Sequence, residues 1–372
     1  MKTVFLYKKS DAEIQSIIAE LSAKKVAWFV GNRSFEACGA ADVFSELIGQ
    51  DNVLVLRGFQ ENPTFSDIQK ATLQVTEFEP DLIVAVGGGT VLDIAKAVSL
   101  LCEVDGLESA SIGEIVAYNY ESKCPLIACP TTAGTGSEAT QFSVVYDNGK
   151  KYSLDHPLLL PDYSVIDSQF TEALGKYQTA VSGIDAFSQA LESYWSNGAT
   201  EESMGYAMSG LERSLDVLED CVNNPSEQSR KKMAEAAHMS GKAIQISRTT
   251  APHALSYTLT IEAGISHGQA VFLILPSVFE YTYEKAVKES KTELVERFNT
   301  LFSILNVTNC VAAKKKLIDF GESIGLKSKL EDLVDDVDVM RASLVEGVNV
   351  QRLKNHPVEL SVEDLEYIVA TL

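Results

Sequence analysis

Short runs of apolar residues, many of them β-branched, alternate with stretches of helical periodicity in the first half of the chain. The apolar runs cover residues 26–30, 53–56, 82–86 and 126–129, and each is followed at once by turn residues. Such runs are typical of buried parallel strands. Helical patterns lie between them, for example at 11–24 and 67–77. This alternation predicts a doubly wound α/β domain with a ligand at the carboxyl ends of its strands.

The strand-like runs stop after about Thr179. From there on the apolar positions follow helical spacing, and they do so over residues 184–195, 201–218, 229–246, 288–305 and 312–324. The segment from Ser361 to Asp364 has the form of a capping box that begins one more helix. We therefore expect an α/β domain over residues 1–180, an all-α domain over residues 181–372, and an active site in the cleft between them.

The charge of the chain limits its partners. Lys and Arg total 31 against 52 Asp and Glu, which gives a net charge of −21. A nucleic acid or an anionic membrane surface requires a cationic face, so neither is expected as the main partner. We find no run of 18 apolar residues and no apolar leader at the start, and the six cysteines form no CxxC pair. These features predict a cytoplasmic protein with reduced thiols.

Two glycine- and hydroxyl-rich loops each follow a predicted strand. The first reads VGGGTVLDIAK at 86–96, and the second reads PTTAGTGSEAT at 130–140. Glycines let a backbone approach a phosphate, and a helix N-terminus supplies N–H donors. Either loop alone could be an ordinary turn, but two at strand ends of one sheet favour a dinucleotide site. The candidate cofactor-binding residues are Gly87, Gly88, Gly89, Thr90, Asp93, Thr131, Thr132 and Thr135.

A dispersed set of polar residues in the second half has the chemistry of a metal site. Asp185 and Gln189 are four apart in a helical segment and so share one face. His253 and His267 lie in apolar surroundings and are two of only five histidines. A carboxylate, an amide oxygen and two imidazoles suit Fe²⁺, Zn²⁺, Ni²⁺ or Mn²⁺. Each histidine alone could equally be a buried, hydrogen-bonded core residue.

Taken together, these motifs resemble the iron-containing (group III) alcohol dehydrogenase family over nearly the whole chain. The resemblance rests on GGGTVLD, PTTAGTGSEAT, GIDAFSQALE, PHALSY, ISHG and the Asn-His-Pro at 355–357. It implies a Rossmann-like N-terminal domain, a helical C-terminal domain, a nicotinamide dinucleotide and one divalent metal, most often iron. By position it implies that Asp185, Gln189, His253 and His267 hold the metal and that Lys151 lies near the ribose. It also implies a homodimer.

The chain departs from the family pattern at two positions. Gln189 stands where the family usually has histidine, and an amide oxygen is a harder and weaker ligand than imidazole. Tyr257 stands where a second histidine often follows, which removes a proton relay through imidazole. The Tyr257 phenol could contact the substrate, pass a proton or simply pack as an aromatic ring.

Further phrases resemble the branch of the family that reduces phosphonoacetaldehyde to 2-hydroxyethylphosphonate. They are KYSLDHP at 151–157, QALESYW at 189–195 and TTAPH at 249–253. Arg248 lies five residues before His253, and its guanidinium could clamp a phosphonate with help from Lys242. An ordinary ion pair is the alternative role for Arg248.

The predicted reaction is hydride transfer between NAD(P)H and a small aldehyde, which can be anionic. No carboxylate follows the strand 26–30, where the chain continues with Asn32 and Arg33, so NADPH should be accepted. Three alternatives stay open. The substrate could be another aldehyde, polyol or sugar-type alcohol, the protein could be a lyase of the dehydroquinate synthase type, or it could bind nucleotide without catalysis.

Overall fold

A computed structural model describes the chain except for residues 61, 103, 105, 107–109, 149 and 349, and except for the side chains of 350 and 351. It separates into two compact units, an α/β unit over Met1–Leu174 and a helical unit over Gly175–Leu372. The boundary predicted from the sequence, between 180 and 181, falls inside the first long helix of the second unit, which begins at Lys176.

The α/β unit is built on a six-stranded parallel sheet with the order β1-β8-β5-β4-β2-β3. The prediction of a parallel sheet is confirmed, and β1 and β8 add strands that the apolar pattern did not reveal. An antiparallel hairpin of β6 and β7 forms a second, separate sheet. The strands are β1 Lys2–Leu6, β2 Val26–Val30, β3 Val53–Leu56, β4 Leu82–Gly87, β5 Leu126–Pro130, β6 Phe142–Asp147, β7 Lys150–Asp155 and β8 Tyr163–Asp167.

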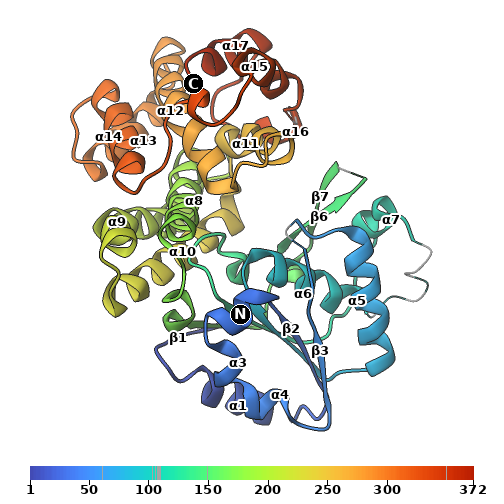
Figure 1. Cartoon of the computed structure of the whole chain (residues 1–372). Helices are drawn as coiled ribbons and strands as arrows, with labels where there is room; N and C mark the ends of the chain where they lie inside the picture. Colours follow the sequence, from blue (N-terminus) through green and yellow to red (C-terminus); the bar gives the residue numbers. More distant parts are fainter. Residues whose placement is uncertain (61, 103, 105, 107–109, 149, 349) are drawn as a thin grey trace. The chain divides into compact units, whose positions relative to one another are not determined.

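Helices cover both faces of this sheet, because alternate residues of each buried strand point to opposite sides. On one face, α5 and α6 pack on Phe29, Ala85 and Ala128. On the other, α1 and α3 pack on Trp28, Val84 and their neighbours (Figure 1). The α-helices of this unit are α1 Ser10–Glu20, α2 Arg33–Ala37, α3 Ala40–Val43, α4 Ser45–Ile48, α5 Phe65–Phe78, α6 Gly89–Leu101 and α7 Ile112–Ala117.

The order of connections reverses between β2 and β4. From β2 the chain goes outward to β3, and from β3 it returns to the other side of β2 to form β4. In doubly wound sheets the carboxyl ends of the strands at such a reversal are the usual place for a ligand. The segments that begin at Gly31 and Gly88 follow the two strands that flank this point.

Among its described residues, the second unit contains helices and no β-strands. Its α-helices are α8 Lys176–Trp195, α9 Glu201–Asn223, α10 Glu227–Ser247, α11 Ala251–Glu262, α12 His267–Lys288, α13 Thr292–Ile304, α14 Cys310–Ser323, α15 Val337–Glu346, α16 Val350–Leu353 and α17 Val362–Ala370. The predicted helical character is confirmed, including the capping box of Ser361 and Asp364. The helix predicted over 288–305 is present as α13, but it begins at Thr292 instead of Lys288, because α12 ends at Lys288 and Ser290 takes a positive φ between the two helices. Among the described residues, no helix is both long and apolar enough to cross a bilayer.

Candidate active site

Three potential metal ligands converge in the helical unit. One ligand atom each from Asp185, His253 and His267 lies within 4.8 Å of the others. Nε2 of His253 lies 3.2 Å from Oδ1 of Asp185, and Nε2 of His267 lies 3.9 Å from the same oxygen. Asp185 and His253 are buried, whereas the side chain of His267 keeps 33% of its surface exposed. The cluster therefore has one open side.

The three residues come from α8, α11 and α12, and close packing at one glycine helps bring them together. His267 is the first residue of α12 and is followed by Gly268. A Cβ atom on Gly268 would lie 1.9 Å from the carbonyl oxygen of Val181, one turn before Asp185 on α8. Only glycine allows this approach of α12 to α8, and the approach places His267 beside Asp185.

Gln189 lies one turn after Asp185 on α8 and offers a further ligand. Its Nε2 donates to Oδ2 of Asp185 at 3.0 Å. Its Oε1 is buried and has no hydrogen-bond partner among the described residues. A buried acceptor without a donor is costly, and a bound cation would remove that cost. The donor set of one carboxylate, two imidazoles and one amide oxygen thus fits a divalent transition metal.

A second buried carboxylate, which the sequence analysis did not assign, holds His253 in place. Glu192 accepts a hydrogen bond from Nδ1 of His253, which leaves Nε2 to face Asp185. Burial lowers the pKa of His253, but the carboxylates of Glu192 and Asp185 outweigh it and raise the pKa to about 10. Burial likewise opposes ionisation of Asp185, yet the hydrogen bond from His253 and the nearby His267 hold its pKa below the usual value.

Glu192 is itself fixed by the beginning of α11. Its Oε2 accepts from the backbone N–H of Thr250 at 2.7 Å and from the Thr250 hydroxyl at 2.9 Å. That hydroxyl accepts in turn from the indole N–H of Trp195 at 2.9 Å. The signal for Glu192 was present in the sequence, because Asp185, Gln189 and Glu192 follow the i, i+4, i+7 spacing of one helix face.

Tyr257 packs against His267, the partly exposed member of the cluster. Its ring stacks on the imidazole of His267, with centroids 5.7 Å apart and an angle of 3° between the planes. Its hydroxyl accepts a hydrogen bond from Nη1 of Arg352 at 2.8 Å. Arg352 lies in α16, nearly a hundred residues later in the chain, and nothing in its sequence neighbourhood marked it as a site residue.

Arg248 and Lys242, the cations predicted to bind a phosphonate, lie on α10 or at its end. Arg248 caps α10 with a φ of 62° and donates to the carbonyl oxygen of Gln245. Asn355 holds the backbone on both sides of it, through the carbonyl oxygens of Ser247 and Thr249. The ammonium of Lys242 lies over the ring of Tyr206, 3.9 Å from its centroid.

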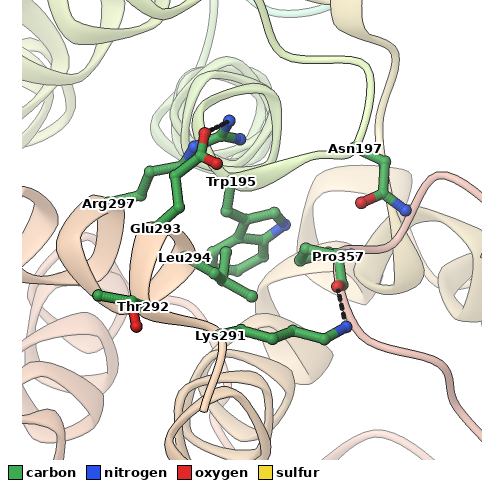
Figure 2. Close-up of a pocket in the computed structure, with 8 residues that line it drawn as sticks. All are labelled: Trp195, Asn197, Lys291, Thr292, Glu293, Leu294, Arg297 and Pro357. Atoms are coloured by element: carbon green, nitrogen blue, oxygen red, sulfur yellow. Dashed lines mark hydrogen bonds and ion pairs between the residues drawn. The ribbon is translucent and has the colours of Figure 1, made fainter. Parts of the chain in front are cut away.

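A separate hollow of about 380 Å³ opens elsewhere in the helical unit (Figure 2). Its cations are engaged by the protein, since Lys291 donates to the carbonyl of Pro357 and Arg297 pairs with Glu293. The indole of Trp195 also lines it. None of the predicted site residues lines this hollow.

In the α/β unit, the two glycine-rich loops lie next to each other at the ends of β4 and β5. The backbone N–H of Thr131 donates to the carbonyl of Gly87 at 3.0 Å. A Cβ atom on Gly88 would lie 3.5 Å from the Thr132 side chain, and one on Gly89 would lie 3.0 Å from Thr135. Gly88 is the N-cap of α6, and Thr90 lies in the first turn. A larger residue at these glycines would fill the space over the helix N-terminus, where a phosphate can bind.

The segment after β2 lies beside the first of these loops. The N–H of Gly31 donates to the carbonyl of Val86 at the end of β4. Asn32 follows as the N-cap of α2 and is exposed, as is Arg33. Lys151 lies on the β6–β7 hairpin, opposite Tyr146 in the ladder.

Both carboxylate oxygens of Asp93 accept hydrogen bonds from the protein. Oδ1 accepts from the Ser137 hydroxyl at 2.6 Å, and Oδ2 accepts from the N–H of Val144 at 3.0 Å. Lys96, which the sequence analysis passed over, is fully buried and donates to the carbonyls of Ser137 and Phe142. Together Asp93 and Lys96 tie α6 to the segment that follows β5.

Both units match models of one protein family. Residues 2–168 match the model described as iron-containing alcohol dehydrogenase, and residues 179–372 match the C-terminal model of the same family. The chain belongs to the iron-containing alcohol dehydrogenase family. This family uses NAD(P) and a divalent metal, and the loops and the ligand cluster provide fitting residues for both.

Individual members of the family show how far the likeness extends. The chain is 32% identical to phosphonoacetaldehyde reductase of Streptomyces viridochromogenes over 60% of its own length and 59% of that protein. It is 31% identical to long-chain-alcohol dehydrogenase 1 of Geobacillus thermodenitrificans over 74% of its length and 67% of that protein. The crystal structure of sulfoacetaldehyde reductase from Bifidobacterium kashiwanohense with NAD⁺ superimposes with a TM-score of 0.85 at 26% identity, covering 100% of this chain and 96% of that one.

Proposed function

We propose that this family member is a metal-dependent NAD(P)H aldehyde reductase whose substrate is phosphonoacetaldehyde. The products are 2-hydroxyethylphosphonate and NAD(P)⁺, formed when a hydride moves from the nicotinamide to the carbonyl carbon and a proton is added to the oxygen. The observation that carries the proposal is the ligand cluster of Asp185, Gln189, His253 and His267 on three helices.

Each ligand has a defined role in this reaction. Asp185, His253, His267 and Oε1 of Gln189 would hold one divalent ion, most often iron in this family. When bound, such an ion supplies a Lewis acid that polarises the carbonyl and stabilises the developing alkoxide. Glu192 accepts from Nδ1 of His253 and so would leave Nε2 available to hold the ion. The exposed part of His267 marks the side from which the aldehyde enters.

The α/β unit would bind the dinucleotide at the carboxyl ends of β2, β4 and β5. The N-terminus of α6, with Gly88 and Gly89, offers N–H donors to the pyrophosphate. Thr90, Thr131, Thr132 and Thr135 add hydroxyl donors around the same point, and Lys151 is assigned to the ribose. A Cβ atom on Gly89 would lie 3.0 Å from the Thr135 side chain, so glycine keeps this backbone accessible to a phosphate.

For the phosphonate we retain Arg248 as one candidate contact. Its backbone is held by Asn355, and the residue precedes α11, which carries His253 and Tyr257. The Tyr257 hydroxyl is a candidate proton donor, with water as the alternative. In Arg248→Ala we expect the KM for phosphonoacetaldehyde to rise about tenfold, and an unchanged KM would remove Arg248 from the proposal.

An aldehyde panel tests the function. Protein loaded separately with Fe²⁺, Zn²⁺, Ni²⁺ or Mn²⁺ is given NADH or NADPH with phosphonoacetaldehyde, sulfoacetaldehyde, propanal or butyraldehyde. We expect loss of nicotinamide absorbance, fastest with phosphonoacetaldehyde. If butyraldehyde is reduced equally well, the substrate assignment fails and another aldehyde or polyol takes its place.

Two further outcomes would change the class of protein. A dehydroquinate synthase-type lyase regenerates its cofactor, so it would convert its substrate without net change in nicotinamide absorbance. A protein that binds dinucleotide but retains no metal after loading, and reduces none of the aldehydes, would be non-catalytic.

A further inference from the structure

Arg352 has no carboxylate partner among the described residues, although the chain is rich in acids. Its guanidinium donates to the Tyr257 hydroxyl, and its Cζ lies 4.8 Å from the centroid of the Tyr257 ring. Among the residues that the structure describes, no Asp or Glu forms an ion pair with it. This is unusual, because acids outnumber bases 52 to 31 and most arginines of the helical unit have an acidic or carbonyl partner.

Arg352 is connected to the ligand cluster by one aromatic ring. Tyr257 stacks flat on His267, and His267 faces Asp185. Tyr257 and Arg352 are both half-buried, and His267 is one-third exposed. The three side chains therefore form a partly exposed row that leads away from the cluster and ends in a positive charge. We call His267, Tyr257 and Arg352 the cationic row.

We propose that Arg352, positioned by Tyr257, binds the tetrahedral oxyanion of the substrate, a phosphonate or a sulfonate, while the aldehyde oxygen is held at the ligand cluster. This rests on the proposed function and names a specificity residue for it. The planar guanidinium still has donors left after one bond to Tyr257, and it can present two of them to two oxygens of such a group.

The row offers a cation to a short substrate that carries an anion. In a two-carbon aldehyde, the carbonyl oxygen and the oxyanion are separated by two carbon atoms, so the oxyanion would stay near the cluster when the carbonyl is held there. Arg352, over the Tyr257 ring that stacks on His267, is the cation of this row. A neutral aldehyde of the same length, such as propanal, has no group for Arg352 to bind.

The test compares aldehydes that share the CH2–CHO end and carry a phosphonate, a sulfonate or a neutral methyl group at the other end. Steady-state kinetics with phosphonoacetaldehyde, sulfoacetaldehyde and propanal are measured for the wild type, Arg352→Ala and Arg352→Lys. We expect Arg352→Ala to lower the ratio of kcat/KM for phosphonoacetaldehyde to that for propanal by about 100-fold, mainly through KM. Arg352→Lys keeps the charge but not the planar fork, and should recover part of the ratio. The two anionic aldehydes separate a phosphonate from a sulfonate substrate.

The matched control is Lys354→Ala, which removes an exposed cation two residues away and should leave the ratio at its wild-type value. If Arg352→Ala lowers kcat/KM equally for the anionic and neutral aldehydes, Arg352 only supports the structure around Tyr257 and the inference is overturned. A general effect of net charge would instead appear in Lys354→Ala as well, and would also overturn it.

A binding experiment separates this inference from the proposed function. Calorimetry measures the affinity of 2-hydroxyethylphosphonate for metal-loaded wild type and Arg352→Ala. Binding that is weakened about 100-fold by the substitution supports the role of Arg352 even if no aldehyde is turned over. Equal affinity in both proteins overturns it even if the wild type is an active reductase.

Discussion

Glu192 accepts a hydrogen bond from Nδ1 of His253, and the opposite ring nitrogen lies 3.2 Å from Asp185. The carboxylate thus selects the tautomer in which Nε2 can bind a metal. We expect Glu192→Gln to weaken binding of Fe²⁺ or Zn²⁺ by about 10- to 100-fold, because a neutral amide holds the imidazole less firmly and makes it a weaker donor. Competition with a chelator of known affinity measures the change.

The control for this prediction is Glu219→Gln, which removes an exposed carboxylate from α9. It should bind metal as the wild type does. An unchanged metal affinity in Glu192→Gln would mean that His253 is oriented by its packing alone, and that Glu192 serves only to hold α11 to α8.

Gln189 leads to the opposite prediction, in which a substitution tightens metal binding. Its Oε1 lacks a hydrogen-bond partner in the described structure, so it is available as a ligand. We expect Gln189→His to tighten Zn²⁺ binding by about tenfold, because imidazole is the better donor for this ion. Gln189→Ala should weaken it. Equal affinity in all three proteins would show that the metal is held by Asp185, His253 and His267 only.

The sequence predicted the fold most reliably where the apolar pattern was strongest. Three of the four predicted strands, β2, β4 and β5, lie inside the sheet and are fully buried. The fourth, β3, is an edge strand, but all four of its residues are apolar. The edge strand β1 is half-buried and mixed in polarity, so it carries no such pattern. The break between α12 and α13 depends on a positive φ at Ser290, which no periodicity indicates.

The site was only partly predictable, for a different reason. Asp185 and Gln189 share one helix face, so their proximity follows from spacing alone. The approach of His253 and His267 depends on tertiary packing, including the contact of Gly268 with Val181, and was expected only through the family resemblance. Arg352 reaches Tyr257 across 95 residues of chain, and neither local spacing nor the motifs we compared pointed to it.

The choice between NADH and NADPH is the subject of a third prediction. Arg33 is exposed at the start of α2, next to the loops that follow β4, and Glu36 of the same helix is engaged by Arg57 at 3.0 Å. A 2′-phosphate there would meet the exposed guanidinium of Arg33, while the carboxylate of Glu36 is paired with Arg57. We expect NADPH to be accepted, and Arg33→Ala to raise the KM for NADPH more than that for NADH. A preference for NADH of about 100-fold in the wild type would contradict this.

The last prediction concerns stability and pH, and it involves a charge remote from the ligand cluster. Asp364, in the first turn of α17, accepts from Lys285, from the Tyr281 hydroxyl and from the Ser361 backbone. Partial burial raises its pKa, but these bonds outweigh it and hold the pKa at about 2, against an ordinary value of 3.8. Since the folded-state pKa is the lower one, the stabilisation is complete above pH 3.8 and is lost as the pH falls toward 2.

After allowance for solvent screening we expect Asp364→Asn to lower the free energy of unfolding by about 1 kcal/mol at pH 7, and by progressively less below pH 4. Urea unfolding at pH 7, 5, 4 and 3 measures this, with Asp338→Asn, whose side chain is 97% exposed, as the control. A difference between Asp364→Asn and wild type that stays constant down to pH 3 would show that the lost contribution is steric rather than electrostatic.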